Sequence, residues 1–369
     1  MQDALDKLTI RGFKSIRELK NFELKNLNVI VGANGAGKSN LLSFFKMLHK
    51  LMDDNLADYV RKNGGISNIL YNGIKITEKM TFEMRFGVRG YKFTINPTAE
   101  EGIVLTDEAR YYSGRWWGLG DYNDCLSQLV KEVKSGVGND SRNSKFVYDT
   151  IMSWKVYHFH DTSPNAPMRK WENIEDDEML RPDASNIAPF LLHLRKEYKT
   201  EYQNILNACQ IIMPYLKDFL LKERIFGEAN EIRRVNLSWR TKTSDFPMQP
   251  YHLSDGSIRF ICLATALLQP NLPSTLIIDE PELGLHPEAI RILGELINSA
   301  AKRTQIIIAT QLPLLIDQFN IDDIVVVNRK DDQSIFERLN KEDFDKWLED
   351  YSVGELWVKN VIQGGVCHE

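Results

Sequence analysis

Short runs of consecutive apolar residues, followed by polar turns and then helical patterns, recur in the first and last thirds of the chain. Leu27–Val31 and Thr275–Ile278 have the length and the unbroken apolar character of buried strands. Residues 40–52 and 258–268 repeat apolar positions at helical spacing. This succession predicts an α/β protein whose central sheet is flanked by helices.

Strict alternation of apolar and polar residues marks two further segments, 81–86 and 91–95. Because Gly87 and Gly90 lie between them, the pattern predicts an antiparallel hairpin beside the central sheet. The pattern changes again between residues 111 and 230, where loops precede helical spacing at 185–224. We therefore expect three parts: residues 1–110, a largely helical insertion at 111–230, and residues 231–369.

The eight residues after the first apolar run match the phosphate-binding pattern GxxxxGK[ST] without a gap. A strand, a glycine-rich loop and a helix follow one another here, which is the context that the pattern requires. The backbone N–H groups of such a loop and the following helix start surround phosphates. The segment therefore predicts binding of a nucleoside triphosphate with Mg²⁺, Lys38 lying at the β- and γ-phosphates and Ser39 at the metal. The expected nucleotide-binding residues are Gly32, Asn34, Gly35, Ala36, Gly37, Lys38, Ser39 and Asn40.

Two carboxylates, Asp279 and Glu280, end the apolar strand that begins at Thr275. Ligands of open α/β sheets bind at the carboxyl ends of strands. We expect Asp279 to hold magnesium and Glu280 to orient and deprotonate the attacking water, which is the positioning that phosphoryl transfer needs.

A third segment, Leu253-Ser254-Asp255-Gly256-Ser257, precedes the helical pattern 258–268. Ser254 is a good helix N-cap, and an ordinary cap explains the segment as well as a nucleotide-binding role does. Its position shortly before Asp279 and Glu280 favours the nucleotide-binding role.

With the three motifs in this order, the chain resembles RecF/SMC-type ATPases of the ABC class, and within them the small ATPases related to the OLD group. The resemblance implies a P-loop NTPase fold of mixed sheet core, antiparallel β patch and helical insertion. It also implies that Ser254 and Gly256 cap the γ-phosphate of ATP bound to a second protomer. Residues 8–16 resemble the first strand and the turn beside the adenine, which would make Arg11 and Lys14 nucleotide-binding residues.

Two positions depart from the family pattern. Gln311 follows the strand 306–310 at the switch position, where histidine is commoner. Glutamine can hydrogen-bond the γ-phosphate but cannot carry a proton, so the resemblance implies slow hydrolysis. The glutamine loop of the family cannot be placed by spacing, although the segment 64–72 lies near the expected distance.

Composition and charge narrow the class of protein. Net charge is −5, so the whole-molecule balance gives no sign of a nucleic-acid binder. No apolar run approaches the length of a membrane span, no secretory signal is visible, and the four scattered cysteines fit a reduced cytoplasm. His158 and His160 have a spacing that could bind a metal on a strand, but no carboxylate or cysteine set lies near them in sequence. About 58 residues follow Gln311, too few for the nuclease domain of full-length OLD proteins.

The sequence thus leads us to expect a cytoplasmic ATPase that uses ATP-driven dimerisation as a switch in DNA repair or antiphage defence. Its expected partners are a second copy in an ATP-sandwich dimer or higher oligomer, and a separate effector such as a nuclease or toxin. Nucleic acid stays open as a partner, and no membrane is expected. The alternatives are a RecF-like ATPase that binds DNA directly, a transporter subunit, which the long insertion argues against, and a nucleotide-gated scaffold with negligible turnover.

Overall fold

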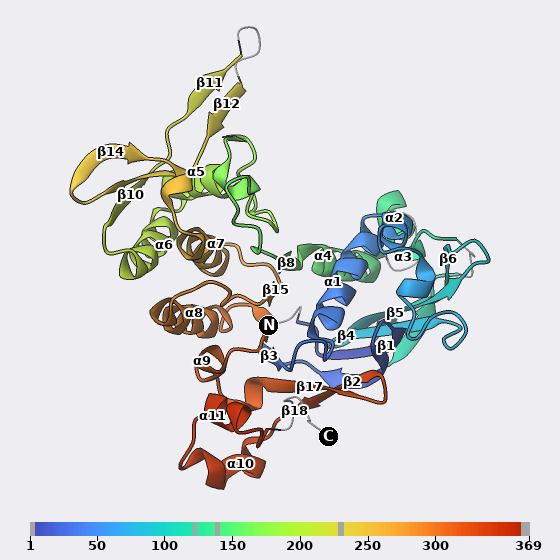
Figure 1. Ribbon diagram of the computed structural model, residues 1–369. Helices are drawn as coiled ribbons and strands as arrows, with labels where there is room; N and C mark the ends of the chain where they lie inside the picture. The colour runs from blue at the N-terminus through green and yellow to red at the C-terminus, as the bar shows by residue number, and fades with distance from the viewer. Residues whose placement is uncertain (1–3, 121–123, 137–140, 228–231, 363–369) are drawn as a thin grey trace.

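The computed structural model describes residues 4–120, 124–136, 141–227 and 232–362. Its centre is a six-stranded sheet in the order β18-β17-β3-β16-β15-β8, parallel except for β18 at one edge. We call it the parallel sheet (Figure 1). Its strands are β3 (Leu27–Val31), β8 (Lys155–Tyr157), β15 (Thr275–Asp279), β16 (Gln305–Thr310), β17 (Ile324–Lys330) and β18 (Gln333–Arg338).

A second six-stranded sheet, the antiparallel sheet, runs in the order β2-β1-β4-β5-β6-β7. The predicted hairpin is confirmed as β4 and β5, with Phe86 opposite Arg89 where the chain turns. The strands are β1 (Lys7–Phe13), β2 (Ile16–Glu23), β4 (Met80–Phe86), β5 (Arg89–Pro97), β6 (Ile103–Tyr112) and β7 (Arg115–Gly118).

Helix α1 (Lys38–Met52) lies between the two sheets (Figure 1). Its Phe44 and Phe45 are buried in one cluster with Phe82 of the antiparallel sheet and Ile277 and Ile307 of the parallel sheet. Alternate residues of the parallel strands face this cluster, because side chains along a strand point to opposite faces. The apolar runs of the sequence are therefore buried on both sides.

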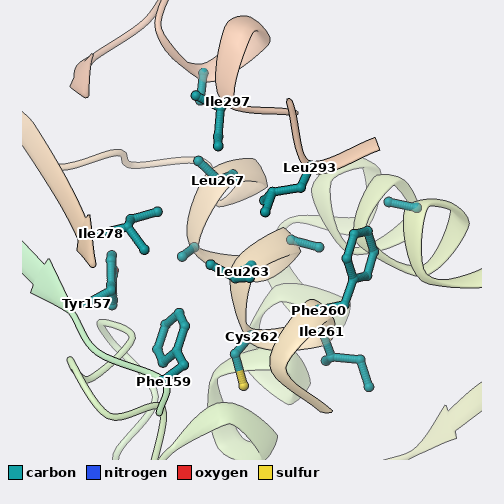
Figure 2. Close-up of a cluster of buried hydrophobic side chains, with 14 of the residues drawn as sticks. Tyr157, Phe159, Phe260, Ile261, Cys262, Leu263, Leu267, Ile278, Leu293 and Ile297 are labelled. Atoms are coloured by element: carbon teal, nitrogen blue, oxygen red, sulfur yellow. The ribbon is translucent and has the colours of Figure 1, made fainter. Parts of the chain in front are cut away.

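The opposite face of the parallel sheet is covered by α7 (Asp255–Leu268) and α8 (Pro287–Ala300). Figure 2 shows the centre of this second cluster, where Leu263 and Leu267 of α7 lie near Ile278 of β15 and Leu293 of α8. Helices α1 and α7 consequently lie on opposite faces of one sheet.

Residues 111–230 contribute to several places rather than to one body. Helices α3 (Gln128–Ser135) and α4 (Ser141–Ser153) join the cluster around α1, and β8 lies at the edge of the parallel sheet. Helices α5 (Ile187–Glu197) and α6 (Lys199–Ile212) pack on the α7 side. The expected boundary near residue 230 falls on residues 228–231, outside the described part of the chain.

The remaining elements lie at the periphery. Two three-stranded sheets, β10-β13-β14 and β11-β12-β9, project at the top left of Figure 1. Their strands are β9 (Glu172–Asn173), β10 (Leu216–Leu220), β11 (Arg224–Phe226), β12 (Ile232–Val235), β13 (Ser238–Thr241) and β14 (Ser244–Met248). The other helices are α2 (Leu56–Lys62), α9 (Pro313–Ile316), α10 (Lys341–Leu348) and α11 (Val353–Val358). Among the described residues, no helix is long and apolar enough to cross a membrane.

Candidate nucleotide site

The phosphate loop, Gly32–Ser39, joins the carboxyl end of β3 to the first turn of α1. Gly35 and Gly37 have φ values of 81° and 112°, which glycine adopts without the steric cost that other residues meet. A Cβ on Gly37 would also overlap the hydroxyl of Ser334. Gly35 and Gly37 are therefore required by the backbone conformation of the loop, and Gly37 also by the close approach of Ser334 on β18.

A chain of hydrogen bonds supports this loop from β18 and from the turn between β1 and β2. The Asn40 amide donates to the Ser15 hydroxyl at 2.6 Å, Ser15 and Ser334 share a bond of 2.7 Å, and Ser334 donates to the Ala36 carbonyl at 2.6 Å. Since Ser334 uses its proton on Ala36, Ser15 is the donor between the two hydroxyls. Asn40, expected at the nucleotide, is thus a support of the loop in this structure.

Lys38 lies buried inside the loop, with 5% of its surface exposed. Its Nζ donates to the carbonyls of Gly32 at 2.5 Å and Ala33 at 3.1 Å. Burial lowers the pKa of Lys38, and the carboxylates of Glu280, Asp279 and Glu282 act in the opposite direction. The predicted lysine and the predicted carboxylates are therefore brought together.

Asp279 ends β15 with a half-buried side chain. Its Oδ1 is buried and has no hydrogen-bond partner among the described residues, while the carboxylate also bonds Ser39. Burial raises the pKa of Asp279, and the charges of His160, Lys46 and Lys38 counteract that rise. Sequence reasoning missed Lys46 because it lies on the exposed side of a helix, where lysine is ordinary.

Glu280 has a φ of 44°, a left-handed conformation that is uncommon outside glycine and asparagine. Its N–H donates to the Ala309 carbonyl of β16 at 2.9 Å, which fixes the backbone where the strand ends. Strained backbone of this kind occurs at functional sites. Glu280 therefore lies beside Asp279 on a turn that neighbouring β16 holds in place.

A third carboxylate, Glu282, lies buried behind these two. Its Oε1 accepts a hydrogen bond of 2.5 Å from Thr310, the last residue of β16, and the backbone of Gln311 also bonds it. Burial raises the pKa of Glu282. Gln311 itself follows directly, with an exposed side chain. Glu282 lies two residues after Glu280 in the sequence, but no sequence pattern predicted its contact with Thr310.

Two histidines follow β8 at the edge of the parallel sheet. The rings of His158 and His160 stack with centroids 3.9 Å apart, and His160 Nε2 lies 3.1 Å from the carbonyl oxygen of Asp279. Burial, followed by the charges of His160 and Lys46, lowers the pKa of His158 to about 4. The structure thus brings carboxylates close to this pair, although no group of metal-ligating residues is found in the described parts of the chain.

The segment Leu253–Ser257, here the signature loop, begins helix α7 on the other side of the parallel sheet. Ser254 caps the helix by accepting a bond of 3.1 Å from the Ser257 N–H, and it is exposed. Gly256 packs against the loop after β15, since a Cβ there would lie 2.5 Å from the Gly284 carbonyl oxygen. The N-cap expected of Ser254 is therefore present, and the exposure of its side chain leaves the nucleotide-binding role as a prediction.

Arg169 holds the signature loop in place with a side chain that is 5% exposed. Its guanidinium donates to the carbonyls of Pro250 at 2.6 Å and Leu253 at 3.0 Å, and it pairs with Asp255 at 2.9 Å. This support comes from a segment about 85 residues earlier, so sequence reasoning had no signal for it.

Arg11 and Lys14, both expected at the nucleotide, differ in their surroundings. The exposed Arg11 on β1 pairs with Glu18 of β2 at 2.8 Å. Lys14 occupies the β1–β2 turn with a φ of 49°, next to Ser15, which contacts the loop-supporting Ser334. Burial and the charge of Lys46 lower the pKa of Lys14. Of the two, Lys14 is the one whose neighbour borders the phosphate loop.

Three features fit a magnesium-bound nucleoside triphosphate. The glycines leave the loop backbone open, Lys38 is held by carbonyls rather than by an acid, and Asp279 offers a buried oxygen without a partner among the described residues. Ser39 and Asp279 would hold the metal, and the loop with Lys38 would hold the phosphates. When bound, Mg²⁺ neutralises charge on the β- and γ-phosphate oxygens.

Solved structures of SMC head domains share this fold. One, described as the SMC head bound to the C-winged helix domain of ScpA, superposes with a TM-score of 0.59 at 15% identity and covers 93% of this chain and 99% of its own. A second, from Pyrococcus furiosus, has an extended coiled coil and is bound to the C-terminal domain of ScpA. Its TM-score is 0.57 at 14% identity, over 94% of this chain and 99% of that one. The predicted fold class is confirmed.

Comparison with curated proteins finds no match. Comparison with protein families matches residues 27–317 to AAA_21, described as "AAA domain, putative AbiEii toxin, Type IV TA system". The match spans well over half of the 369 residues and includes the phosphate loop, the signature loop and both carboxylates. The chain therefore belongs to the AAA_21 family, and it has the fold of SMC head domains.

Proposed function

We propose that this ATPase works as a nucleotide-driven dimerisation switch that regulates a separate effector, a nuclease or toxin, in antiphage defence or DNA repair. Two copies would enclose two ATP molecules, each between the phosphate loop of one copy and the signature loop of the other. Nucleotide binding would stabilise the closed dimer, and hydrolysis would release it.

The observation that carries this proposal is the placement of the signature loop. Ser254 and Asp255 are exposed at the start of α7, and α7 covers the face of the parallel sheet opposite to α1. Asn34, Gly35 and Ser39 are likewise exposed on the phosphate loop. Two exposed half-sites, each at the start of a helix and the two helices on opposite faces of one sheet, are what a second copy could bring together.

The proposed hydrolysis uses the residues at the carboxyl ends of β3 and β15. Lys38 would stabilise the phosphates, Ser39 and Asp279 would hold magnesium, and Glu280 would take the proton of the attacking water. Gln311, exposed after β16, would hydrogen-bond the γ-phosphate. Because glutamine does not carry protons at neutral pH, we propose that turnover is slow.

Support for a separate partner comes from the comparisons. The family description names a toxin and a type IV toxin–antitoxin system, which favours a defence role over a housekeeping one. The two SMC heads of the same fold were solved with ScpA domains bound to them. We propose the OLD-related ATPases as the subgroup, acting in the cytoplasm with an effector on another chain.

The experiment that tests the switch is the solution mass of Glu280→Gln, measured by light scattering with and without ATP and magnesium. We expect the mass to double only with ATP, because the variant binds nucleotide but does not hydrolyse it. Adding Ser254→Arg should keep the protein monomeric with ATP. A mass that is indifferent to ATP, or dimers that survive Ser254→Arg, would contradict the proposal.

A further inference from the structure

Strand β8 brings a further segment to the nucleotide site, because it is the edge strand next to β15, which ends at Asp279. Strand β8 pairs in parallel with β15, with Tyr157 opposite Ile278. The next residues on the two strands are His158 and Asp279, so both chains leave the parallel sheet at one edge. The segment 158–160 therefore borders the magnesium-binding carboxylate through strand register, although 119 residues separate His160 from Asp279.

His160 contacts Asp279 through the backbone. Its Nε2 lies 3.1 Å from the Asp279 carbonyl oxygen, and a carbonyl can only accept, so Nε2 carries the proton. In the neutral ring the other nitrogen, Nδ1, is an acceptor, and it can take a hydrogen bond from a metal-bound water. This bond fixes the backbone of Asp279, and Asp279 Oδ1 is the buried oxygen that has no partner among the described residues.

Arg259 connects the same segment to the signature helix. Its side chain, 5% exposed, starts on α7 five residues after Ser254. The guanidinium donates to the carbonyls of Phe159 at 2.9 Å, His160 at 3.1 Å and Leu283. One buried arginine thus binds the segment after β8 and the loop after Glu280, and it belongs to the helix that the signature loop begins.

From these contacts we propose that His160 is a further positioning residue of the nucleotide site, and that Arg259 transmits the state of that site to the signature helix. Sequence spacing could not place the glutamine loop of the family. In the structure, a polar side chain beside Asp279 comes from the segment after β8. When magnesium binds Asp279, His160 keeps the carboxylate in place. A displacement of His160 moves the carbonyls that Arg259 holds, and with them the first turn of α7. This inference rests on the proposed function for the trans role of the signature loop.

The first test is the magnesium dependence of ATP binding, measured by calorimetry in the Glu280→Gln background so that no hydrolysis occurs. His160→Ala should raise the magnesium concentration for half-maximal binding by about 10-fold, the usual effect of removing a group that orients a metal ligand. Binding of ATP without magnesium should stay within about 3-fold, since the phosphate loop is unchanged. His160→Gln, which can still donate to the carbonyl, should recover most of the loss.

His193→Ala is the matched control, because His193 lies on α5 and contacts Asp177 rather than the nucleotide site. It should leave the magnesium dependence at the wild-type value. Equal magnesium dependence of His160→Ala and His193→Ala, or a loss that His160→Gln does not recover, would overturn the role of His160.

Coupling is tested by light scattering of the same variants with ATP and saturating magnesium. Arg259→Lys keeps the charge but cannot reach three carbonyls at once, so it should weaken ATP-dependent dimerisation about 10-fold while the magnesium dependence stays near wild type. Adding His160→Ala should then weaken dimerisation by less than it does alone, because both changes break one connection. Strictly additive effects would overturn the coupling.

The outcomes separate the two proposals. If wild type and Glu280→Gln remain monomeric with ATP, the proposed switch fails, and the calorimetric comparison still decides the role of His160. If the dimer forms and His160→Ala matches wild type in magnesium dependence, only the further inference fails.

Discussion

The hydroxyl of Thr310 donates a hydrogen bond of 2.5 Å to the buried carboxylate of Glu282. This bond joins the end of β16 to the loop that follows Glu280, so the proposed switch residue Gln311 and the proposed catalytic residue Glu280 share one anchor. Glu282 Oε2 is buried without a partner among the described residues, so the carboxylate is held by Thr310 and by backbone N–H groups such as that of Gln311.

Thr310→Val should destabilise the protein, because it removes the donor and keeps the shape. We expect the free energy of unfolding in urea to fall by about 1–3 kcal/mol, the contribution of a hydrogen bond to a charged group, because the backbone bond from Gln311 remains but the Thr310 bond is lost. Thr265→Val is the matched control, since that buried threonine donates only to the Ile261 carbonyl of its own helix, and it should cost less than about 1 kcal/mol. Equal effects of the two changes would contradict this account.

The free energy of unfolding of Glu282→Gln should increase relative to that of wild type as the pH rises. The folded pKa of Glu282 lies above its ordinary value of 4.5, so the folded state binds this proton more tightly than the unfolded state. That contribution is complete below pH 4.5 and is lost as the pH rises through the folded pKa, at about 1.4 kcal/mol for each pKa unit. Urea unfolding of both proteins at several pH values between 4 and 8 measures this difference in stability. A difference that does not change with pH would show that burial does not penalise this charge.

Gly37→Ala should abolish nucleotide binding, whereas Gly35→Ala should weaken it. Both positions have positive φ, which costs an alanine about 1–2 kcal/mol. Only at Gly37 would the added methyl group also overlap Ser334, while nothing lies within 4 Å of a Cβ on Gly35. Fluorescent-nucleotide titration of the two variants measures the contrast, and comparable affinities would refute the supporting role of Ser334.

Asp279→Asn should leave the nucleotide-free protein at least as stable as wild type. Burial raises the pKa of Asp279, so the charge is unfavourable before magnesium binds, and an amide removes it. The variant should lose the extra stability that magnesium adds to the ATP complex, which is about 2.7 kcal/mol when ligand is at 100 times its Kd. Thermal unfolding with ATP, with and without magnesium, checks both halves. A clear loss of stability without nucleotide would mean that the carboxylate has a structural role.

The contiguous parts of the site were predictable, because their signals are local. The phosphate loop and its strand and helix lie within residues 27–52, and the strand ending at Asp279 has an apolar run at residues 276–278. The supports were not predictable, since they join distant segments: Ser15 and Ser334 are 319 residues apart, and Arg169 reaches Asp255 over 86. Strand β8 has only three residues, two of them half-buried, which is too short to show a strand pattern.

The same limit explains the middle of the chain. Residues 111–230 show clear helical spacing only at α5 and α6, while α3, α4 and β8 take their places from packing against α1 and β15. The division into three parts therefore stays a prediction. The spacing of His158 and His160 drew attention to the pair in the sequence. The contact of His160 with Asp279 could not be predicted, because Asp279 lies 119 residues later.

The order of strands in the parallel sheet has a consequence for synthesis on the ribosome. Strand β3, which carries the phosphate loop, pairs with β16 and β17, and both are made almost 300 residues later. The Ser334 hydroxyl that supports the loop is translated later still. Because chains emerge at about 5–20 residues per second, the loop waits on the order of tens of seconds for its neighbours. A chain whose synthesis has not passed Ser334 therefore carries the whole phosphate-binding motif without its supporting strands, and we expect it not to bind nucleotide.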